Sequence, residues 1–293
     1  MSFSSVRVLD TVHRTLPLAL RFWDEAAGAL RIDGLAIEAF PVSTPGARRV
    51  SAHANAGGYY LVSGLPGLRE LEYGPGDDAD FAASPSPVFR VEVSDPQARY
   101  LPFAFDATAT RGVLPLPCAL AGSPLRAQLE KGLPLFSAPA RQLAEPLATV
   151  YAQLVESGSG RAAAWALLAA EIDGVEVGLG LADEEGRVAL FFAYPQPPHQ
   201  AITSPPTPAE RFVWQVSFRA YYLPRPAGTA APSRPDLCAV LAQLEHPRRV
   251  LDLQSPPQAL LPQRLDYRRP LVLRSADPAP GGAVASHLFI ETA

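Results

Sequence analysis

The amino-acid sequence predicts a mainly β protein with two tandem antiparallel β-sandwich domains, a proline-rich linker and a C-terminal extension. Residues 18–62 and 149–192 show the same order of apolar runs and turns, as a duplicated unit would. Within each stretch apolar and polar residues alternate, which is typical of strands with one buried face. The 32 prolines cluster between these runs, where a missing backbone donor does not interrupt a central strand.

The length and composition set the domain organisation. A chain of 293 residues with 48% hydrophobic residues is long and apolar enough for two or three packed domains. We expect an N-terminal arm and first sandwich over residues 1–115, a linker over 116–143, a second sandwich over 144–226 and an extension over 227–293.

The first sandwich is expected to open with a strand over residues 18–24. Further strands follow from the alternation over 35–40 and 89–93. Asp95-Pro96-Gln97-Ala98 has the composition of a type I turn. Residues 100–105 then predict a last strand, which Pro102 places at the edge of a sheet.

The second sandwich carries two turn signals. Asp173-Gly174 suits a type I′ turn, in which both central residues have positive φ, so it predicts a tight hairpin. Residues 183–186 predict a longer hairpin turn, with Gly186 in the left-handed conformation.

The C-terminal extension has a different pattern. Leucine and valine at helical spacing predict a helix over 235–245, capped by Ser233 and ended by Pro247. Residues 270–274 and 287–290 predict strands. These strands either complete the second sandwich or pair with a neighbouring chain.

Composition also narrows the partners and the compartment. A net charge of −4 and a pI near 5.8 argue against nucleic acid, which requires clustered Lys and Arg. The start of the chain shows no signal peptide, and no apolar run is long enough for membrane insertion. We therefore expect cytoplasmic synthesis, with a place in a released particle as one destination. Cys118 and Cys238 are expected to be buried free thiols.

The sequence offers no catalytic or cofactor signature. Its five histidines are scattered, and it has no P-loop, G-x-S-x-G elbow or G-x-G-x-x-G turn. We therefore predict no enzyme activity, no cofactor and no metal. The acidic loop 74–80 could supply oxygen ligands to calcium, but it lacks EF-hand spacing, and a solvated loop is the favoured interpretation. The three tryptophans are interpreted as core residues rather than as sugar-stacking platforms.

Aromatic residues on strands give the candidate binding surface. Adjacent strand residues face opposite ways, so one tyrosine of the pair at 59–60 and one of the pair at 221–222 should point outward. Interfaces favour tyrosine. The candidate interface residues are Tyr59, Tyr60, Tyr100, Phe103, Tyr221, Tyr222 and Phe289. The expected edge strands 100–105 and 287–290 could join a partner's sheet by β-augmentation.

Both repeats resemble a known family. Each has an opening strand, an acidic-to-Gly turn (Asp24 to Gly28; Glu156 to Gly160) and a second strand. The first repeat adds residues 57–67, Gly-Gly-Tyr-Tyr-Leu-Val-Ser-Gly-Leu-Pro-Gly. These features resemble the carboxypeptidase-regulatory-like or transthyretin-like (prealbumin-like) β-sandwich, an Ig-like architecture. The resemblance covers about two thirds of the chain.

The resemblance implies a scaffold rather than an enzyme. The enzymes of that family, the hydroxyisourate hydrolases, end in Tyr-Arg-Gly-Ser, whereas this chain ends Glu-Thr-Ala. Residues 134–139 and 183–192 also look like segments of proteins from extracellular contractile injection systems, which are phage-tail-like particles. This likeness implies a structural protein that contacts other subunits, including copies of itself. Two alternatives stay open: a carbohydrate or cell-surface binding module, and an unrecognised hydrolase.

Overall fold

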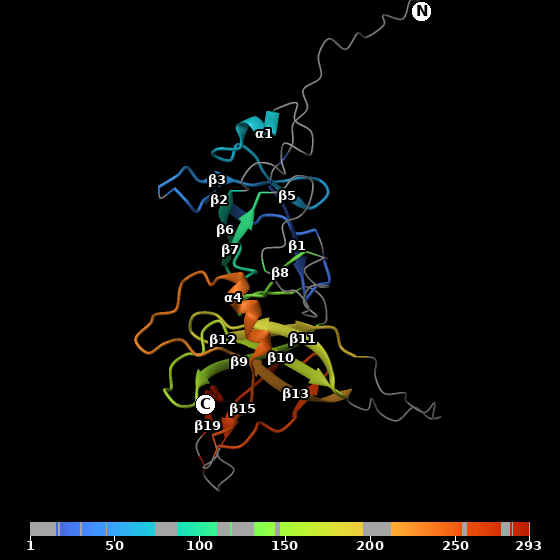
Figure 1. The fold of residues 1–293 in the computed structure, drawn as a ribbon. Helices are drawn as coiled ribbons and strands as arrows, with labels where there is room; N and C mark the ends of the chain where they lie inside the picture. The colour runs from blue at the N-terminus through green and yellow to red at the C-terminus, as the bar shows by residue number, and fades with distance from the viewer. Residues whose placement is uncertain are drawn as a thin grey trace, which may run out of the picture.

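The computed structural model describes residues 16, 18–29, 31–44, 46–73, 87–109, 118, 132–143, 147–195, 212–253, 257–276, 282 and 284–292. Figure 1 shows two β units, one after the other along the molecule, with the short helix α4 (Leu237–Ala242) at their junction. Each unit consists of sheets that enclose an apolar core, so the predicted mainly β, sandwich-type fold is confirmed.

The first sandwich contains two four-stranded sheets. Its strands are β1 (Leu18–Asp24), β2 (Ala36–Pro41), β3 (Val50–Ser51), β4 (His53–Ala54), β5 (Tyr59–Val62), β6 (Val88–Ser94), β7 (Phe103–Thr108) and β8 (Leu133–Leu135). The sheet orders are β4-β5-β1-β8 and β3-β2-β6-β7. All these pairs are antiparallel except β1 with β8, which run parallel.

The alternation in the sequence places the core of this sandwich. Leu18, Leu20 and Phe22 of β1 are each 1% exposed, while the residues between them are half-buried. They pack against inward residues of the facing sheet, including Phe89 and Phe103. Burying a side chain of this size stabilises a fold by about 1.5–3 kcal/mol, so the period-2 pattern determines which face of each strand lies inside.

Hydrogen bonds hold two loops of the first sandwich in place. Helix α1 (Arg69–Tyr73) places the Glu72 carboxylate against the backbone, where it accepts hydrogen bonds from the amides of Gly64 (2.6 Å) and Leu65 (3.3 Å). The expected turn after β6 is present, since the Ala98 amide donates to the Asp95 carbonyl at 2.9 Å. The following strand begins at Phe103, just after Pro102, rather than at Tyr100.

The second sandwich contains two five-stranded sheets. Its strands are β9 (Ala148–Glu156), β10 (Leu167–Ile172), β11 (Val175–Leu181), β12 (Arg187–Phe192), β13 (Val213–Tyr221), β14 (Pro247–Arg248), β15 (Val250–Leu251), β16 (Gln263–Asp266), β17 (Leu271–Val272) and β20 (Leu288–Ile290). One sheet has the order β11-β10-β13-β14, with β16 also on β13. The other has the order β12-β9-β20-β15, with β17 also on β9.

The C-terminal extension belongs to both sheets of the second sandwich. Strands β14 and β16 pair with β13, while β17 and β20 lie parallel to β9. A small two-stranded sheet of β18 (Ser275–Ala276) and β19 (Val284–Ala285) joins the last two of these segments. The predicted tail strands therefore complete the second sandwich.

The two turn predictions have different outcomes. Asp173 (φ 53°) and Gly174 (φ 77°) connect β10 to β11 as a two-residue turn with positive φ, as predicted. Gly186 is left-handed (φ 78°), also as predicted. However, the 183–186 turn is not a hairpin, because β11 and β12 lie in different sheets and the turn crosses from one sheet to the other.

The core of the first sandwich continues over α4 onto the outer face of the second sandwich and forms a shared core at this junction, while the inner core of the second sandwich is a separate cluster. Leu237, Val240 and Leu241 of this helix are 1–3% exposed and pack in the core of the first sandwich. The same cluster contains Trp165 and Leu167 from the outer face of the second sandwich. This explains why β10 is buried on both faces and reads as a continuous apolar run in the sequence.

The start of α4 differs from the prediction. The helix begins at Leu237, and its cap is Asp236 rather than Ser233. The Asp236 carboxylate accepts hydrogen bonds from the amides of Cys238 (3.0 Å) and Ala239 (3.1 Å). Pro235 lies before the cap, and a residue that precedes proline is kept out of the helical conformation, so the helix starts after it.

The free-thiol prediction is wrong. Cys118 and Cys238 form a disulfide across a sequence separation of 120 residues. The long separation argued against a bridge, but the extension folds back over the junction and brings α4 to Cys118, which lies between β7 and β8. The acidic loop at 74–80 lies outside the described residues.

Candidate functional site

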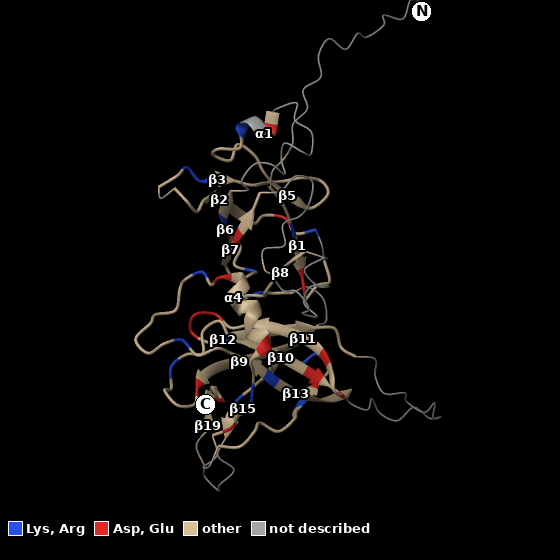
Figure 2. Cartoon of the chain, in the orientation of Figure 1, with Lys and Arg blue, Asp and Glu red and all other residues tan. Residues whose placement is uncertain are grey.

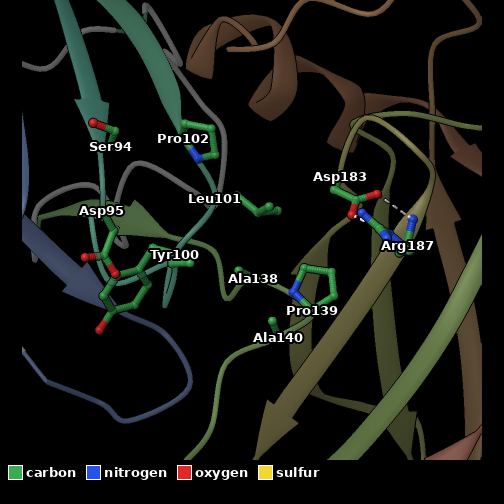
Figure 3. A pocket seen from close by; sticks show the side chains of 11 residues that line it. Ser94, Asp95, Tyr100, Leu101, Pro102, Ala138, Pro139, Ala140, Asp183 and Arg187 are labelled. Atoms are coloured by element: carbon green, nitrogen blue, oxygen red, sulfur yellow. Dashed lines mark hydrogen bonds and ion pairs between the residues drawn. The ribbon is translucent and has the colours of Figure 1, made fainter.

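A groove of about 540 Å³ lies where the two sandwiches meet (Figure 3). The first sandwich contributes the turn after β6 and the segment that leads into β7. The strand β8 continues into a third part of the wall, and the second sandwich contributes the turn before β12. The lining residues are Ser94, Asp95, Ala98, Tyr100, Leu101, Pro102, Ala138, Pro139, Ala140, Asp183 and Arg187.

The charged residues of the groove are paired within their own turns. Asp183 accepts hydrogen bonds from the Arg187 amide (2.8 Å) and from Arg187 Nε (2.8 Å), and the side-chain bond raises the pKa of Arg187. Asp95 binds Arg99 in the same way, at 2.8 Å. Burial raises the pKa of Asp95, but the hydrogen bonds from Arg99 and the turn amides outweigh it and leave the pKa below its usual value.

This pairing decides what the groove can do. The Asp95 carboxylate is a poor general base, because its lowered pKa weakens its affinity for a proton. The remaining lining is mainly apolar and includes Leu101, Pro102 and Pro139. The groove therefore fits the packing of an apolar or proline-containing segment better than it fits proton transfer.

A buried ionic cluster closes the first sandwich beside this groove. Asp24, the last residue of β1, receives two hydrogen bonds from Arg141 (3.0 and 2.5 Å) and one from the Tyr100 hydroxyl (2.7 Å). The Asp24 and Arg141 side chains are 2% and 5% exposed. Burial raises the pKa of Asp24, and the hydrogen bonds from Arg141 and Tyr100 lower it further than burial raises it.

The second sandwich repeats this arrangement. Glu156, the last residue of β9, accepts hydrogen bonds from the Tyr222 hydroxyl (2.7 Å), from Arg161 Nε (2.9 Å) and from Ser159. Burial together with the bond to Glu156 raises the pKa of Tyr222 to about 12. In both repeats a left-handed glycine follows the acid by four residues, at Gly28 (φ 62°) and Gly160 (φ 68°). The duplication thus preserves a strand-end carboxylate with one arginine and one tyrosine.

An aromatic cluster lies on the second sandwich where β13 begins. Tyr194 packs against Trp214 (ring centroids 5.1 Å apart) and against Tyr267 (4.8 Å), and Phe212 lies 6.0 Å from Tyr267. Trp214 is 7% exposed, and its indole N–H has no hydrogen-bond partner among the described residues. Tyr267 is 39% exposed, and Arg268 lies over its ring. This cluster combines an apolar platform with an unpaired donor.

Four of the seven candidate interface residues are buried, which corrects their assignment. The four are Tyr60, Tyr100, Phe103 and Tyr222, each 6% exposed or less. The three tyrosine hydroxyls have internal partners. Tyr60 donates to the Ile32 carbonyl at 3.0 Å, while Tyr100 and Tyr222 donate to the carboxylates of Asp24 and Glu156. Side chains inside a core cannot contact a partner unless the fold opens.

The other three candidates are half-buried. They are Tyr59, Tyr221 and Phe289. Tyr59 lies on the outer face of its strand, as the strand geometry predicted. In the second pair neither tyrosine faces outward, because Tyr222 is buried and Tyr221 packs at the junction. Tyr59 lies under Arg21, whose guanidinium is 5.7 Å from the ring centroid, while Phe289 packs edge-on against His287. Tyr221 packs against the shared core at the junction.

Neither expected edge strand is open for β-augmentation. Strand β20 lies between β9 and β15, so both of its edges are hydrogen-bonded. At the start of β7, the Ala104 amide donates to the Pro235 carbonyl at 2.9 Å. The Leu101 amide donates to Phe136 at the same distance. The chain itself occupies both edges.

Figure 2 shows basic and acidic residues interspersed along the chain of both sandwiches, in line with the small net charge. Across the described ranges, no three His, Cys, Asp or Glu side chains come together as a metal site requires. In that same part of the chain, no helix has the length and apolar character to cross a membrane.

Sequence reasoning did not identify Arg141 and Arg161 as site residues. One signal was present: Asp24 and Glu156 occupy inward-facing positions of strands that are otherwise apolar. A carboxylate at such a position requires a buried cation or several donors. The arginine itself could not be located, because it follows the acid by 117 residues in one repeat and by 5 in the other.

Comparison of the chain with protein-family models, with curated proteins and with solved structures finds no match in any of the three.

Proposed function

We propose that this chain is a non-enzymatic structural or assembly protein, in which two rigid tandem β-sandwiches provide surfaces for other protein subunits. The observation that carries the proposal is the shared core at α4. Separate, mobile modules would leave Leu237, Val240 and Leu241 exposed, whereas here they are buried between the two units. Burial of this kind fixes the relative orientation of two modules, which suits a spacer or adaptor.

The geometry of the junction supports the same role. Arg234 pairs with Glu92 of β6, and Asp236 pairs with Arg90 at 2.7 Å, so ion pairs add to the apolar contacts. The groove beside the junction has an apolar lining and internally paired charges. When a partner covers such a surface, the burial of apolar area stabilises the complex, and no charge is left buried without a counter-charge.

We further propose that each unit is a carboxypeptidase-regulatory-like, transthyretin-like domain and that the assembly is a contractile, phage-tail-like particle. The support is local. The two segments that look like injection-system proteins, 134–139 and 183–192, are far apart in the sequence, yet both supply residues to the groove: Ala138 and Pro139 from one, Asp183 and Arg187 from the other. A partner that docks in the groove would contact both segments.

Co-sedimentation tests this role. The purified chain is mixed with contractile particles assembled from the proteins encoded beside it, and the pelleted fraction is measured. We expect the wild type to pellet with the particles and Ala140→Arg, which places a long cation on the exposed rim of the groove, to pellet several-fold less. Ala56→Arg, an equally exposed alanine in the turn before β5, is the matched control. A chain that stays monomeric and does not pellet contradicts the proposal.

The aromatic cluster of Tyr194, Phe212, Trp214 and Tyr267 favours a second candidate, a carbohydrate or cell-surface binding module. Aromatic rings can stack on sugars, and Tyr267 offers the exposed ring of this cluster. Calorimetry against a glycan panel tests it, with Tyr267→Ala as the variant. Binding heat for the wild type that is absent for the variant would favour glycan binding at this cluster. Flat titrations for both proteins would exclude it.

A further inference from the structure

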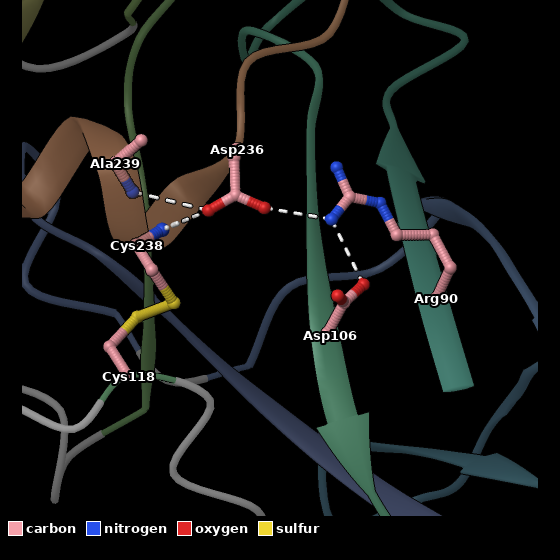
Figure 4. The surroundings of a disulfide bond; sticks show 6 residues. All are labelled: Arg90, Asp106, Cys118, Asp236, Cys238 and Ala239. Carbon is pink, nitrogen blue, oxygen red and sulfur yellow. Dashed lines mark hydrogen bonds and ion pairs between the residues drawn. A yellow bond between two sulfur atoms is a disulfide. The ribbon is translucent and has the colours of Figure 1, made fainter. Parts of the chain in front are cut away.

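The disulfide between Cys118 and Cys238 lies at α4, next to the ion pairs of Arg90 with Asp106 and Asp236 (Figure 4). Cys238 is in the first turn of α4, two residues after the capping residue Asp236. Cys118 lies in the chain between β7 and β8 of the first sandwich and is 8% exposed. The bond therefore attaches the helix that fills the junction to the first sandwich.

Helix α4 depends on tertiary contacts for its position. It has six residues, and a helix of that length is not stable on its own in water. On one side it is held by the first sandwich, through Asp236 to Arg90 (2.7 Å) and the Pro235 carbonyl to the Ala104 amide (2.9 Å). On the other side Gln243, just after the helix, donates to the Trp165 carbonyl at 2.7 Å.

The disulfide is the one covalent contact in this set. Its ring spans residues 118–238 and so includes every strand from β8 to β13. A cross-link over a ring of this length strongly restricts the unfolded chain, and it also keeps α4 near its seat when the non-covalent contacts open locally. Its presence depends on the surroundings, because reducing compartments keep such pairs as thiols and oxidising compartments do not.

We propose that Cys118 and Cys238 form a redox-controlled clasp, which closes in an oxidising compartment and then locks α4 between the two sandwiches. The chain made in the cytoplasm carries two thiols and an α4 that opens readily. After it reaches oxidising surroundings, the bond forms and the two units become one rigid body. The clasp does not rest on the assembly role, since a chain that binds no particle can still close it.

The chemistry needs a disulfide oxidant, such as oxidised glutathione. One cysteine thiolate attacks a sulfur of the oxidant and releases one thiol, which gives a mixed disulfide. The second cysteine thiolate then attacks the protein sulfur of this mixed disulfide and releases the second thiol. Cys118 and Cys238 are oxidised together by two electrons and lose two protons, and the oxidant is reduced to two thiols.

The first experiment measures the redox state of the full-length chain. The protein is equilibrated in glutathione buffers of increasing oxidised fraction, free thiols are alkylated, and the products are identified by mass spectrometry. In oxidising buffers we expect a chain lighter by two hydrogen atoms and a cross-linked peptide pair that contains Cys118 and Cys238. In cytosol-like buffers we expect two alkylated cysteines. Two alkylated cysteines throughout the series would overturn the proposal.

The second experiment locates the effect by hydrogen–deuterium exchange with and without a phosphine reductant. Reduction should speed exchange about 10-fold in α4 and around Trp165, while the interiors of β1 and β9 change little, because the opening is local. The global melting temperature should fall by about 5–15 °C, as for the loss of a disulfide in a chain of this size. A uniform increase in exchange over the whole chain, or no increase at α4, would show that the disulfide does not control α4 specifically. Either result would overturn the proposal.

The matched control is the double variant Cys118→Ser/Cys238→Ser. It should exchange like the reduced wild type and should not respond to the reductant. If the variant does not fold, the reduced wild type supplies the same comparison. A response of the double variant to the reductant would mean that the effect does not pass through these two cysteines and would also overturn the clasp.

Discussion

At the scale of single residues, the strand-end carboxylates are the features with the largest expected energetic effect. Asp24 and Glu156 each lie at the inner face of a sandwich with an arginine and a tyrosine around them. An ion pair in such a place adds little net stability compared with an apolar replacement, yet it costs a great deal when one partner is removed alone. The clusters therefore select one packing of each sandwich, because alternatives would leave a buried charge unpaired.

Asp24→Asn should destabilise the protein strongly. The variant keeps the shape of the side chain but leaves the guanidinium of Arg141 buried, at 5% exposure, without its counter-charge. We expect a loss of about 3–5 kcal/mol in the free energy of unfolding, measured by urea denaturation. The control is Asp266→Asn, which breaks the exposed pair with Arg264 and should cost less than about 1 kcal/mol. Equal losses for the two variants would contradict this account.

Gly186→Ala should cost more than Gly174→Ala. Both glycines are left-handed, with φ of 78° and 77°, so both substitutions carry the left-handed penalty of about 1–2 kcal/mol. At Gly174 a new Cβ meets nothing within 4 Å, whereas at Gly186 it would lie 2.3 Å from the Leu154 carbonyl oxygen. The difference between the two losses, measured by chemical denaturation, isolates the backbone clash. A difference near zero would mean that β9 moves away from the turn without cost.

At the scale of elements, β20 shows that a local sequence pattern can predict a strand but not the strands with which it pairs. Its alternation predicted a strand at 287–290, and the structure has β20 at Leu288–Ile290. Its place between β9 and β15 depends on pairings with residues 134 positions away in β9 and 38–40 positions away in β15, for which the sequence carries no local signal. The same reason explains the disulfide and the crossing turn at 183–186. Periodicity and turn chemistry act locally, so they predict strands and turns, whereas partners depend on the whole chain.

Leu288→Ala and Phe289→Ala should separate the structural role of β20 from a surface role. Leu288 points into the core and is fully buried, so its truncation should cost about 2–5 kcal/mol in the free energy of unfolding. Phe289 is half-buried on the outer face and should cost clearly less. Thermal and urea denaturation of both variants test this order. The reverse order would mean that the register of β20 differs by one residue.

At the scale of the whole molecule, stability should fall in acid. Burial raises the pKa of Asp24, Asp95 and Glu156, but hydrogen bonds lower it further, so each folded-state pKa lies below its unfolded value. Depressed carboxyls contribute stability that is fully present above their unfolded pKa, about 4, and that is lost as the pH falls through the folded pKa.

The urea midpoint should therefore change little between about pH 7 and 5 and decline below about pH 4, with each carboxyl contributing up to about 1.4 kcal/mol per pH unit. In Asp24→Asn the decline should be shallower, since one carboxyl no longer titrates. A midpoint that rises on acidification would contradict the sign of all three shifts.

The shared core should make the two sandwiches unfold together. Leu237, Val240 and Leu241 belong to the cluster that also contains Trp165 and Leu167 of the second sandwich, so unfolding of either unit would expose part of this cluster. For the oxidised wild type we expect a single calorimetric transition with equal calorimetric and van't Hoff enthalpies. Leu241→Ala weakens the junction and should split the transition in two. Leu154→Ala, a deletion of the same size inside the second sandwich, should lower the midpoint and keep one transition. Two separate transitions in the wild type would mean that contacts at the junction do not couple the unfolding of the two sandwiches. A scaffold that must hold its partners at a fixed angle requires the single transition.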